Sequence, residues 1–537
     1  MSLLCVSGAG GADAQTPKRG GTLVVGTLRE PACLNAFLER CHGNLPPAGH
    51  IMNLTLRGAF RTGPGFTWQH DLVSSVDFTT RPPFTLTYRI RPQARWSDGV
   101  PITARDFIFT HTTLQKLPES DRAPLGLQFV RSVEPVDAKT VRVFLRSRFA
   151  GWRGLFSNVL PRHALRGEDF AAVWRDGIRN PKTGRAVGSG PFLVGSWARG
   201  SHLTFVRNPR YWGPQRAYLD RIVLRFCREC RDVVAEQVEW LRSRELDLVM
   251  FIGPSGQALD AFRRLPGVTV LAVPGPVWEH FDIRVGPGGH PALRGRQGKQ
   301  VRRALAYAID RAAIGRAIYG ASSGAYSPSE SAAHYSFSPH YRKNWRRYRH
   351  RPDEARRLLA QAGCRRGADA THVCAGERMS LRFVTTADDP ARAQTLSVVQ
   401  RQLAEIGIEV RFVFGTRAAV FDQILPSGEF DLALYSFIGS PSTDALGDYA
   451  CGGRQNYSGY RQRLVTRDLD QARRLLDGGR LADALNRVDA QLARDVPVIP
   501  LFERPLLAAF DPSVRGVSLN TRAWNPFANA ESWWLDR

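Results

Sequence analysis

Residues 380–415 read SLRFVTTADDPARAQTLSVVQRQLAEIGIEVRFVFG, a pattern typical of a strand, a helix and a second strand. Leu381 and Phe383 alternate with a polar residue, residues 391–406 have helical spacing, and residues 408–414 alternate again. When a strand, a helix and a strand follow one another in this way, the two strands pack in parallel through a right-handed crossover. The segment therefore predicts a mixed α/β fold.

Further periodic segments lie on both sides of this unit. Residues 22–27 form a short apolar run, and residues 84–91 and 430–437 add strand-like segments. Apolar residues at intervals of three and four over residues 301–312 predict an amphipathic helix that ends at Gly320. No repeat or low-complexity segment interrupts the series, so the α/β pattern extends over most of the chain.

Two short segments predict a turn and the start of a helix. Residues 96–99, WSDG, are typical of a tight turn in which Gly99 takes a positive φ and Trp96 packs beneath it. Thr103 is a common helix-capping residue and predicts a helix over residues 104–114. We interpret both segments as structural features and not as ligand contacts.

The composition is that of a globular protein. The chain has 537 residues, of which 43% are hydrophobic and 23% are charged. This length corresponds to about three to five structural units. Disordered, collagen-like and coiled-coil proteins are excluded by these values. No uninterrupted run of about 18 apolar residues occurs, so the sequence predicts no transmembrane helix.

The net charge of +25 comes almost entirely from arginine, because the chain has six lysines and 68 arginines. Such a ratio is typical of codon bias in a GC-rich genome, and the arginines are spread over every segment. Only residues 342–351 combine basic with aromatic side chains, as a nucleic-acid site would. We interpret this cluster as a solvated loop and expect no nucleic-acid partner.

The first 14 residues are typical of the remnant of a secretory signal peptide. An apolar or small stretch at residues 3–9 precedes a small-x-small cleavage site at residues 12–14. The basic residues that open such signals are missing, which we attribute to a start codon assigned too far downstream. Cys5 follows Leu4, where a lipoprotein signal needs a small residue, so a lipid anchor is not favoured.

Cysteine usage also indicates export into an oxidising compartment. With Cys5 left out, three close couples are candidate disulfides: Cys33/Cys41, Cys227/Cys230 and Cys364/Cys374. Spacing does not fix connectivity, and a bridge between couples, such as Cys33 with Cys227, stays open. We expect at least two disulfides, including Cys364–Cys374, and a free thiol at Cys451.

Catalytic and cofactor motifs are absent from the sequence. It has no Gly-x-Ser-x-Gly, no His-Glu-x-x-His, no phosphate-binding loop and no Gly-x-Gly-x-x-Gly. Single carboxylates such as Asp282 and Asp444 are interpreted as surface acids. The sequence therefore predicts a binding protein without catalytic residues, metal or cofactor. An exported hydrolase on an unrecognised scaffold is one alternative.

A series of short motifs runs in order from residue 20 to about residue 502. They are residues 20–23 (GGTL), 87–91 (TYRIR), 96–99 (WSDG), 102–107 (ITARDF), 188–192 (GSGPF), 207–213 (RNPRYWG), 301–311 (VRRALAYAIDR), 456–460 (NYSGY) and 497–502 (PVIPLF). In this order they resemble the extracytoplasmic solute-binding proteins of peptide ABC importers, a family of oligopeptide, dipeptide and nickel binders. The resemblance covers nearly the whole chain.

The resemblance implies an α/β periplasmic-binding-protein fold of two lobes joined by a hinge, with an extra inserted subdomain in the first lobe. The first lobe would be discontinuous, at residues 20–55, 188–275 and 501–537. The inserted subdomain would span residues 56–187, and the second lobe residues 276–500. Residues 274–276, PGP, and the pair Pro497 and Pro500 fit the two hinge crossings.

The resemblance also implies a role. Such a protein captures di- and oligopeptides between its closing lobes in the periplasm or another extracytoplasmic space. It then delivers them to a membrane permease that works with an ATPase, and it acts as a monomer without cofactor. A non-peptide ligand in the same fold and role is the alternative: a nickel chelate, haem, an oligosaccharide, an opine or an antibiotic.

An anchor for the amino terminus of the ligand is part of this implied role. In the family, an aspartate in the loop after a second-lobe strand supplies it, and residues 439–444, here called the anchor loop, correspond to that loop. Ser440 stands near where the acid is expected, and Asp444 follows a few residues later. Either Asp444 binds the ligand ammonium or the ligand has no free α-amine.

Residues beside the first predicted hinge crossing are further ligand-binding candidates. Trp278, Glu279 and His280 follow this crossing on a strand that enters the second lobe. An aromatic side chain there could flank a ligand, and Glu279 could supply charge. Core packing is the alternative for Trp278.

Strand ends supply the remaining candidates. Glu30 and Asn35 follow the first strand, and α/β lobes bind ligands at the carboxyl ends of strands. Tyr435 is a candidate from the strand at residues 430–437. We expect Tyr435 and Phe437 to face opposite sides of that strand, so that only one of them faces the ligand.

Overall fold

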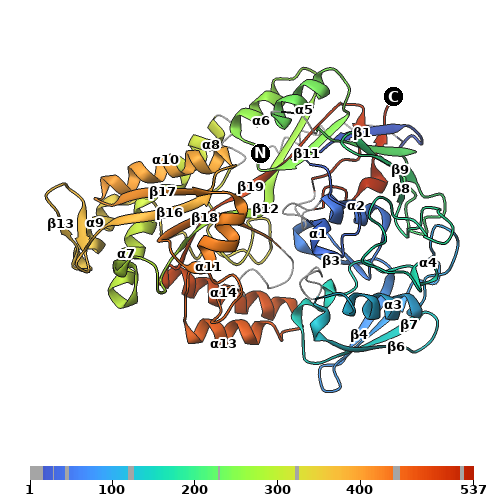
Figure 1. The fold of residues 1–537 in the computed structure, drawn as a ribbon, viewed down its shortest axis with the longest axis horizontal. Helices are drawn as coiled ribbons and strands as arrows, with labels where there is room; N and C mark the ends of the chain where they lie inside the picture. The colour runs from blue at the N-terminus through green and yellow to red at the C-terminus, as the bar shows by residue number, and fades with distance from the viewer. Residues whose placement is uncertain are drawn as a thin grey trace, which may run out of the picture.

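The computed structural model describes residues 16–27, 29–42, 47–118, 126–227, 230, 232–320, 326–439, 448–519 and 525–537. Its helices and strands form two lobes side by side, with the blue-to-green early part of the chain on the right of Figure 1 and the yellow-to-orange later part on the left. The predicted α/β class and two-lobed architecture are confirmed.

One ten-stranded sheet runs through both lobes. In sheet order its strands are β17 (Glu409–Gly415), β16 (Ser380–Thr386), β18 (Leu432–Ile438), β12 (Thr269–Ile283), β19 (Val498–Phe510), β11 (Leu248–Ile252), β1 (Thr22–Gly26), β10 (Arg221–Arg225), β9 (His202–Arg207) and β8 (Phe192–Ala198). The two longest strands, β12 and β19, pair with each other in antiparallel register along both halves of the sheet. They connect the lobes, because each strand has one half in either lobe.

The chain crosses between the lobes at a break in this pairing. Pro274 pairs with Pro505 and the next pair joins Val277 to Arg504, so residues 275–276 bulge out of the ladder. A bulge bends a strand locally, and proline cannot donate to the ladder. We call residues 274–276 and 504–505 the hinge.

The first hinge crossing lies where the sequence predicts it, at residues 274–276. The second lies at residues 504–505, some residues later than the predicted pair Pro497 and Pro500. Residues 498–503 of β19 still pair with the second-lobe half of β12, which leaves both prolines on the second-lobe side of the crossing. The strand can continue past Pro500 because the pairing shifts register there.

The strand–helix–strand unit predicted at residues 380–415 is confirmed. β16 and β17 are parallel over their whole length, and α10 (Pro390–Glu405) connects them. The helix begins after Asp389, whose carboxylate accepts a hydrogen bond from the backbone N–H of Ala391 at 3.1 Å. β18 extends the parallel set on the other side of β16.

The single helix predicted to end at Gly320 is in fact two helices, α7 (Gly295–Ala308) and α8 (Arg311–Tyr319). Asp310 separates them, because its carboxylate accepts hydrogen bonds from two backbone N–H groups in the first turn of α8, at 2.9 and 3.0 Å. Gly320 does end α8, with a φ of +51°. The apolar spacing continues across Asp310 and therefore does not show the break.

In the first lobe, β1 runs parallel to β10 and β11. Two helices, α5 (Val233–Arg242) and α6 (Gly256–Arg263), pack beside β11 and β12. A second, antiparallel sheet consists of β4 (Val73–Phe78), β5 (Thr85–Ile90), β7 (Thr140–Leu145) and β6 (Val130–Pro135). It is accompanied by α3 (Ala104–Gln115) and by the hairpin of β2 (Phe60–Thr62) and β3 (Trp68–His70). These elements lie within the residues assigned to the inserted subdomain.

The predicted turn and helix start in this subdomain are confirmed. Gly99 has a φ of +97° and its N–H donates to the carbonyl of Trp96 at 2.9 Å, while the Trp96 side chain is fully buried. α3 begins after Thr103, whose backbone N–H donates to the carboxylate of Asp106 at 2.8 Å. This reciprocal cap satisfies a donor that the helix start would otherwise leave free.

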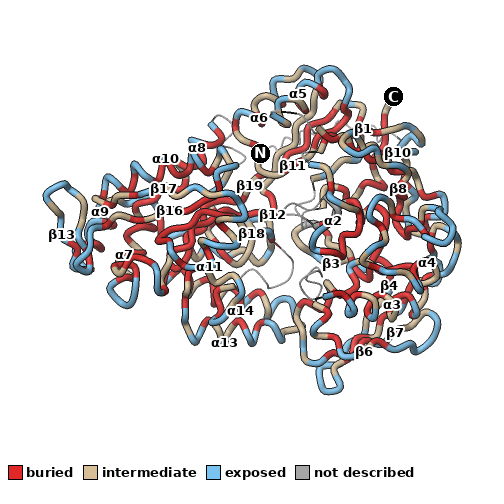
Figure 2. The backbone as a smooth tube through the Cα atoms, in the orientation of Figure 1, coloured by how far each residue is buried: buried red, intermediate tan, exposed pale blue. Residues whose placement is uncertain are grey.

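Each lobe has its own large hydrophobic core. The first-lobe core combines residues from the beginning of the chain with residues near its end, and the second-lobe core spans residues 278–502. Figure 2 shows the second-lobe core in red along β16, β18 and β12. A smaller core lies between α5, α6 and the neighbouring strands. In the part of the chain that the structure describes, no helix has the length and apolarity needed to cross a membrane.

Three disulfides join the three predicted couples: Cys33–Cys41, Cys227–Cys230 and Cys364–Cys374. The bridges between different couples, which the sequence left open, are not formed. Cys451 is free and exposed, as expected.

The basic cluster at residues 342–351 is a solvated loop only in part. Its basic side chains are exposed, but Trp345 and Tyr348 are buried in the second-lobe core. The indole of Trp345 donates to the carboxylate of Asp489 at 2.8 Å. The aromatic residues between the arginines therefore attach the loop to its lobe and are not available to stack on bases.

Candidate functional site

The parallel strands of both lobes end beside the hinge. In the second lobe, β16, β17 and β18 run parallel, and Ile438 at the end of β18 lies opposite Val277. In the first lobe, β1, β10 and β11 run parallel, and Ile252 at the end of β11 lies opposite Leu506. Ligands of open α/β sheets bind outside the carboxyl ends of such strands. The strand ends that meet at the hinge are therefore the candidate binding site.

Apolar and basic side chains lie at these strand ends. Phe414 in β17 and Ile438 in β18 are 51% and 47% exposed, although large apolar side chains are usually buried. Arg29 follows β1, and Arg417 follows β17 with its guanidinium 5.0 Å from the centre of the Phe421 ring. Burial together with the cations Arg392 and Arg29 lowers the pKa of Arg417. Asp388 and Asp422 act in the opposite direction, so charges of both signs surround this guanidinium.

Four rings gather on one face of β12 and β18. His280 stacks between Trp278 and Phe437, with ring centroids 4.4 and 4.7 Å away, and Tyr435 meets it edge-on at 4.4 Å. The expectation that Tyr435 and Phe437 face opposite sides was wrong. Side chains alternate with every residue along a strand, so residues two apart share a face.

His280 is fully buried at the centre of this cluster. Neither ring nitrogen has a hydrogen-bond partner among the described residues. Burial lowers the pKa of His280 to about 3, so the imidazole is neutral at physiological pH. It can hydrogen-bond to a polar group but cannot neutralise an anion. The described parts of the chain contain no group of three or more side chains suited to hold a metal, here or elsewhere.

Asp282 forms the polar end of the same face. Its carboxylate accepts hydrogen bonds from the hydroxyls of Tyr435 at 2.5 Å and Tyr449 at 3.0 Å. Burial raises the pKa of Asp282 to about 7 in spite of these two hydrogen bonds. The interpretation of Asp282 as a surface acid was wrong, since only 1% of the residue is exposed. It lies on the interior face because its strand is covered on both sides.

Glu279, on the opposite face of β12, belongs to a cluster of charges at the hinge. Its carboxylate accepts hydrogen bonds from Arg392 at 3.0 Å and from Nε of Arg504 at 2.6 Å, and Arg504 also pairs with Asp389. Burial would raise the pKa of Glu279, but the two guanidinium groups hold it at about 2. The charge of Glu279 is therefore neutralised inside the protein.

Glu30 and Asn35 make contacts within the first lobe. Glu30 accepts hydrogen bonds from the indole of Trp197 at 2.9 Å and from the N–H of Gly200 at 3.0 Å. Asn35 is buried, and its amide donates to the carbonyl of Phe170 at 3.0 Å. These bonds hold the segment after β1 in place, and direct ligand contact by either residue stays a prediction.

Ser440 and Asp444 lie outside the described residues, and their roles also stay predictions. Gly439, which opens the anchor loop, is described at the end of β18. Its N–H donates to the carbonyl of Pro276 at 2.6 Å, and a β-carbon on Gly439 would lie 2.3 Å from the ring of Tyr335. The anchor loop therefore begins in direct contact with the hinge.

Sequence reasoning did not identify Arg392 or Arg504. Arg504 is 225 residues from Glu279, and arginine is so frequent in this chain that a single one gives no signal. One signal was present, because Glu503 and Arg504 are the two charged residues in the otherwise apolar run of residues 498–510. A charge inside a buried strand needs a partner, which would have directed attention to this position.

Most of the chain is similar in sequence to known proteins. The sequence model of the bacterial extracellular solute-binding proteins, family 5 (middle region), matches residues 67–478. A curated relative, the oligopeptide-binding protein OppA of Mycobacterium tuberculosis, is 27% identical over 505 residues. That alignment covers 92% of this chain and 81% of the relative.

Two solved structures are similar over their whole length. A periplasmic EDTA-binding protein, EppA, has a TM-score of 0.83 at 22% identity, covering 97% of this chain and 98% of EppA. The oligopeptide-binding protein AppA of Bacillus subtilis, solved with a nonapeptide, has a TM-score of 0.73 at 20% identity, covering 97% of this chain and 100% of AppA. At these sequence identities, the similarity shows that both structures have the same fold as this chain.

Proposed function

Because this chain belongs to family 5 of the bacterial extracellular solute-binding proteins, we propose that it captures peptides between its two lobes for an ABC importer. It acts outside the cytoplasm as a monomer, and it passes its ligand to a permease driven by an ATPase. Its action is binding and release without catalysis. The name of the relative OppA supports the peptide class.

The convergence of strand ends from both lobes at the hinge is the observation that supports this proposal. A ligand placed there contacts both lobes on either side of the hinge at residues 274–276 and 504–505, and therefore favours closure. The exposed Phe414 and Ile438 supply apolar surface for side chains. The peptide backbone needs hydrogen-bonding groups along its length, which loops and ordered water provide.

Identification of the natural ligand tests the proposal. We expect mass spectrometry of the exported protein, after mild denaturation, to detect short peptides. Rebinding of such a peptide should raise the melting temperature by mass action and reduce the radius of gyration in small-angle scattering. A library of di- to nonapeptides in which no member raises the melting temperature would contradict the peptide proposal.

The anchor loop provides a sharper test of peptide binding. A charge-assisted hydrogen bond in a closed site contributes about 1.5–3 kcal/mol, or a factor of tens in affinity. We expect Asp444→Asn to weaken the binding of a free-amine peptide by that factor and to leave its N-acetylated analogue almost unaffected, as measured by calorimetry. Asp483→Asn, at an exposed position of the second lobe, is the control. Equal losses for both peptides would mean that the amine is held elsewhere.

An anionic ligand such as a metal chelate is a second candidate. Arg29 of the first lobe lowers the pKa of Arg417 in the second, and neither forms an ion pair among the described residues, although Asp388 interacts electrostatically with both. The related structure EppA is named for EDTA binding. Titration with EDTA and with its metal complexes distinguishes the candidates. Tight binding of a chelate that Arg417→Gln weakens at least tenfold, together with no response to peptides, would favour the second candidate.

A further inference from the structure

Three aromatic side chains meet across the two lobes. Phe66 lies in the turn between β2 and β3 of the first lobe, while Tyr335 and Phe337 belong to the second. The ring of Phe66 is 5.4 Å from that of Tyr335 and 5.3 Å from that of Phe337, and the latter two stack at 5.3 Å. Rings at these separations attract each other beyond their apolar contact.

The turn that holds Phe66 has an unusual backbone. Phe66 has a φ of +59° and follows Gly65 with a φ of +62°. A left-handed conformation is rare at a phenylalanine and requires compensating contacts. The turn also approaches the second lobe itself, because a β-carbon on Gly65 would lie 3.5 Å from the carbonyl oxygen of Phe337. The two second-lobe rings supply the compensating contact.

The second-lobe rings are connected to the hinge. Ser336, between them, donates hydrogen bonds to the carboxyl group of Glu503 from its N–H at 2.6 Å and its hydroxyl at 2.7 Å. Glu503 directly precedes the hinge residue Arg504 in β19. Through this pair of hydrogen bonds, a rotation of the hinge strand moves the segment that holds the rings.

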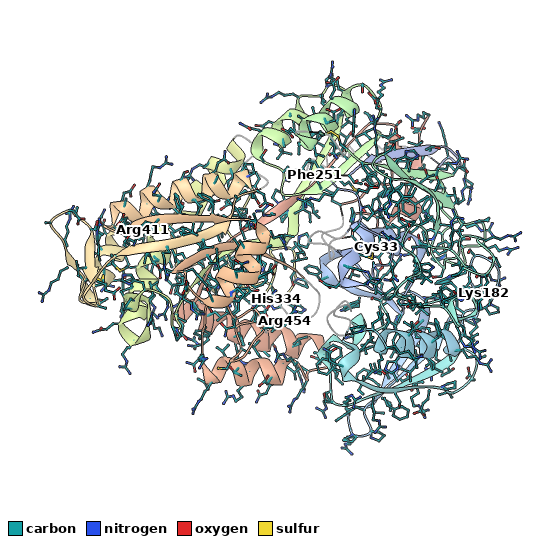
Figure 3. All side chains as sticks on the ribbon, viewed as in Figure 1. Cys33, Lys182, Phe251, His334, Arg411 and Arg454 are labelled. Atoms are coloured by element: carbon teal, nitrogen blue, oxygen red, sulfur yellow. A yellow bond between two sulfur atoms is a disulfide. The ribbon has the colours of Figure 1, made fainter. Side chains whose placement is uncertain are left out.

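The same rings contact the anchor loop. Tyr335 covers Gly439, and the N–H of Gly439 donates to the hinge residue Pro276 at 2.6 Å. Figure 3 labels His334, the neighbour of Tyr335, on the part of the second lobe that is near the first. Tyr335 thus belongs to the aromatic contact and packs against the first residue of the anchor loop, which in turn donates a hydrogen bond to the hinge.

A second contact between the lobes lies at the subdomain. The N–H of Ala150 in the first lobe donates to the carbonyl of Arg473 at 2.7 Å, and Leu476 packs against the first-lobe core. Among the described residues, this contact includes one backbone hydrogen bond and one aliphatic side chain. A third contact lies between α6 of the first lobe and α8 of the second, where a β-carbon on Gly256 would lie 2.6 Å from the carbonyl oxygen of Ile318. The ring contact differs from both because it consists of aromatic side chains and is connected through Ser336 to Glu503 beside the hinge.

We propose that Phe66, Tyr335 and Phe337 form an interlobe latch that holds the two lobes closed and slows ligand release. The inference rests on the proposed function, because a latch has a role only in a protein whose lobes open. Ser336 and Gly439 connect the latch to the hinge and to the anchor loop. A movement of Ser336 or of Gly439 displaces Tyr335 and weakens its ring contact with Phe66.

Phe66→Ala tests the latch, because it removes the first-lobe ring without altering the strand ends proposed to bind ligand. The matched control is Phe78→Ala, which removes a ring of the same subdomain whose contact with Trp152, at 5.8 Å, stays within the first lobe. In ligand-free protein we expect Phe66→Ala to have a larger radius of gyration than wild type. Amide exchange at residues 335–337 should be faster by about tenfold, the factor expected for two lost aromatic contacts.

Phe78→Ala should match wild type in both measurements. Equal scattering and equal exchange in Phe66→Ala and wild type would overturn the latch, as would a wild-type protein already as extended as the variant. If Phe66→Ala does not fold, Gly439→Ala replaces it, since its β-carbon would lie 2.3 Å from the ring of Tyr335 and displace it. All these measurements are made without ligand. A protein with an intact latch that binds nothing in the ligand screen would therefore reject the proposed function alone.

Discussion

At the scale of single residues, the region around the hinge contains buried acids in contrasting environments. Asp282 and Glu503 have pKa values that burial raises to about 7. Glu279 is equally buried, but Arg392 and Arg504 hold its pKa at about 2. Burial favours the neutral form of an acid, and only the neighbouring cations reverse that preference at Glu279. A fall in pH therefore increases the contribution of Asp282 and Glu503 to the stability of the folded protein and decreases that of Glu279.

Glu503→Gln should change the pH dependence of stability. Between pH 4.5 and about 7 the unfolded chain releases the Glu503 proton while the folded protein keeps it, because its pKa is raised from 4.5 to about 7. The stabilisation by this group is complete below pH 4.5 and is lost as the pH rises through 7. In wild type, the contribution of Glu503 to the free energy of unfolding should fall by about 3 kcal/mol between pH 4.5 and 7.5. We expect this decrease to be absent from the variant when both proteins are unfolded in urea at the two pH values.

The matched control for Glu503→Gln is Glu405→Gln, an exposed position at the end of α10. This variant should keep the wild-type dependence of unfolding free energy on pH. Identical dependence in both variants would show that Glu503 titrates at an ordinary pKa in the folded protein.

Glu279→Gln should strongly destabilise the protein at neutral pH. The substitution leaves Arg392 and Arg504, whose side chains are only 10% and 14% exposed, without the carboxylate that they share. Removal of one partner of a buried ion pair costs about 3–5 kcal/mol when the remaining charge is left uncompensated. Asp389 still pairs with Arg504 and lies 3.8 Å from Arg392, so we expect a loss at the lower end of this range. Denaturant unfolding measures the loss. Glu354→Gln, which breaks an exposed pair with Arg357, should leave the unfolding free energy almost unchanged, and equal effects would contradict the argument.

At the scale of elements, capping residues determine where helices begin more precisely than apolar spacing does. The spacing around residue 309 is the same on both sides of Asp310, yet the capping carboxylate starts α8 there. Asp389 has the same role for α10, and Thr103 with Asp106 for α3. Each cap satisfies backbone N–H groups that have no partner within the helix.

The Cys364–Cys374 disulfide should stabilise the elements around it. It joins the chain just after α9 (Pro352–Gln361) to β14 (His372–Cys374) and closes a loop with a sequence separation of 10. Loop-closure entropy predicts a contribution of about 2–3 kcal/mol. We expect Cys364→Ser/Cys374→Ser to lose this amount in denaturant unfolding, and Cys451→Ser to lose almost none. A double variant as stable as wild type would contradict the prediction.

At the scale of the whole molecule, two strands carry the connection between the lobes. β12 and β19 pair on both sides of the hinge, and their register changes only at the hinge and near Pro500. Both lobes thus share one continuous sheet, whose parallel strands end at the hinge from either side. This arrangement lets the lobes rotate about two short segments while each core stays intact.

Gly275→Ala should disturb this connection. A β-carbon on Gly275 would lie 2.3 Å from the backbone carbonyl oxygen of Arg504, so the two hinge crossings must move apart. We expect a loss of about 1–3 kcal/mol in unfolding free energy and a changed scattering curve. Gly478→Ala, whose β-carbon would meet no atom within 4 Å, is the control and should match wild type. An unchanged scattering curve for Gly275→Ala would contradict the proposed close approach.

Local features of this protein were determined by the sequence itself. The unit at residues 380–415, the turn at residues 96–99, the start of α3 and the three disulfide couples all agree with prediction. Each depends on residues close together in the chain, where periodicity, capping and backbone conformation act directly. The order of short motifs along the chain also indicated the family, because each motif encodes a local feature of the same fold.

The tertiary structure alone decided which distant residues meet. It paired Glu279 with an arginine 225 residues away, buried Asp282 between two tyrosines, and placed Phe66 against Tyr335 across the lobes. Such contacts depend on how the strands of the sheet are ordered and on where the chain crosses the hinge. The chain contains many arginines and aromatic residues with equal local preferences, so only long-range packing selects the partners.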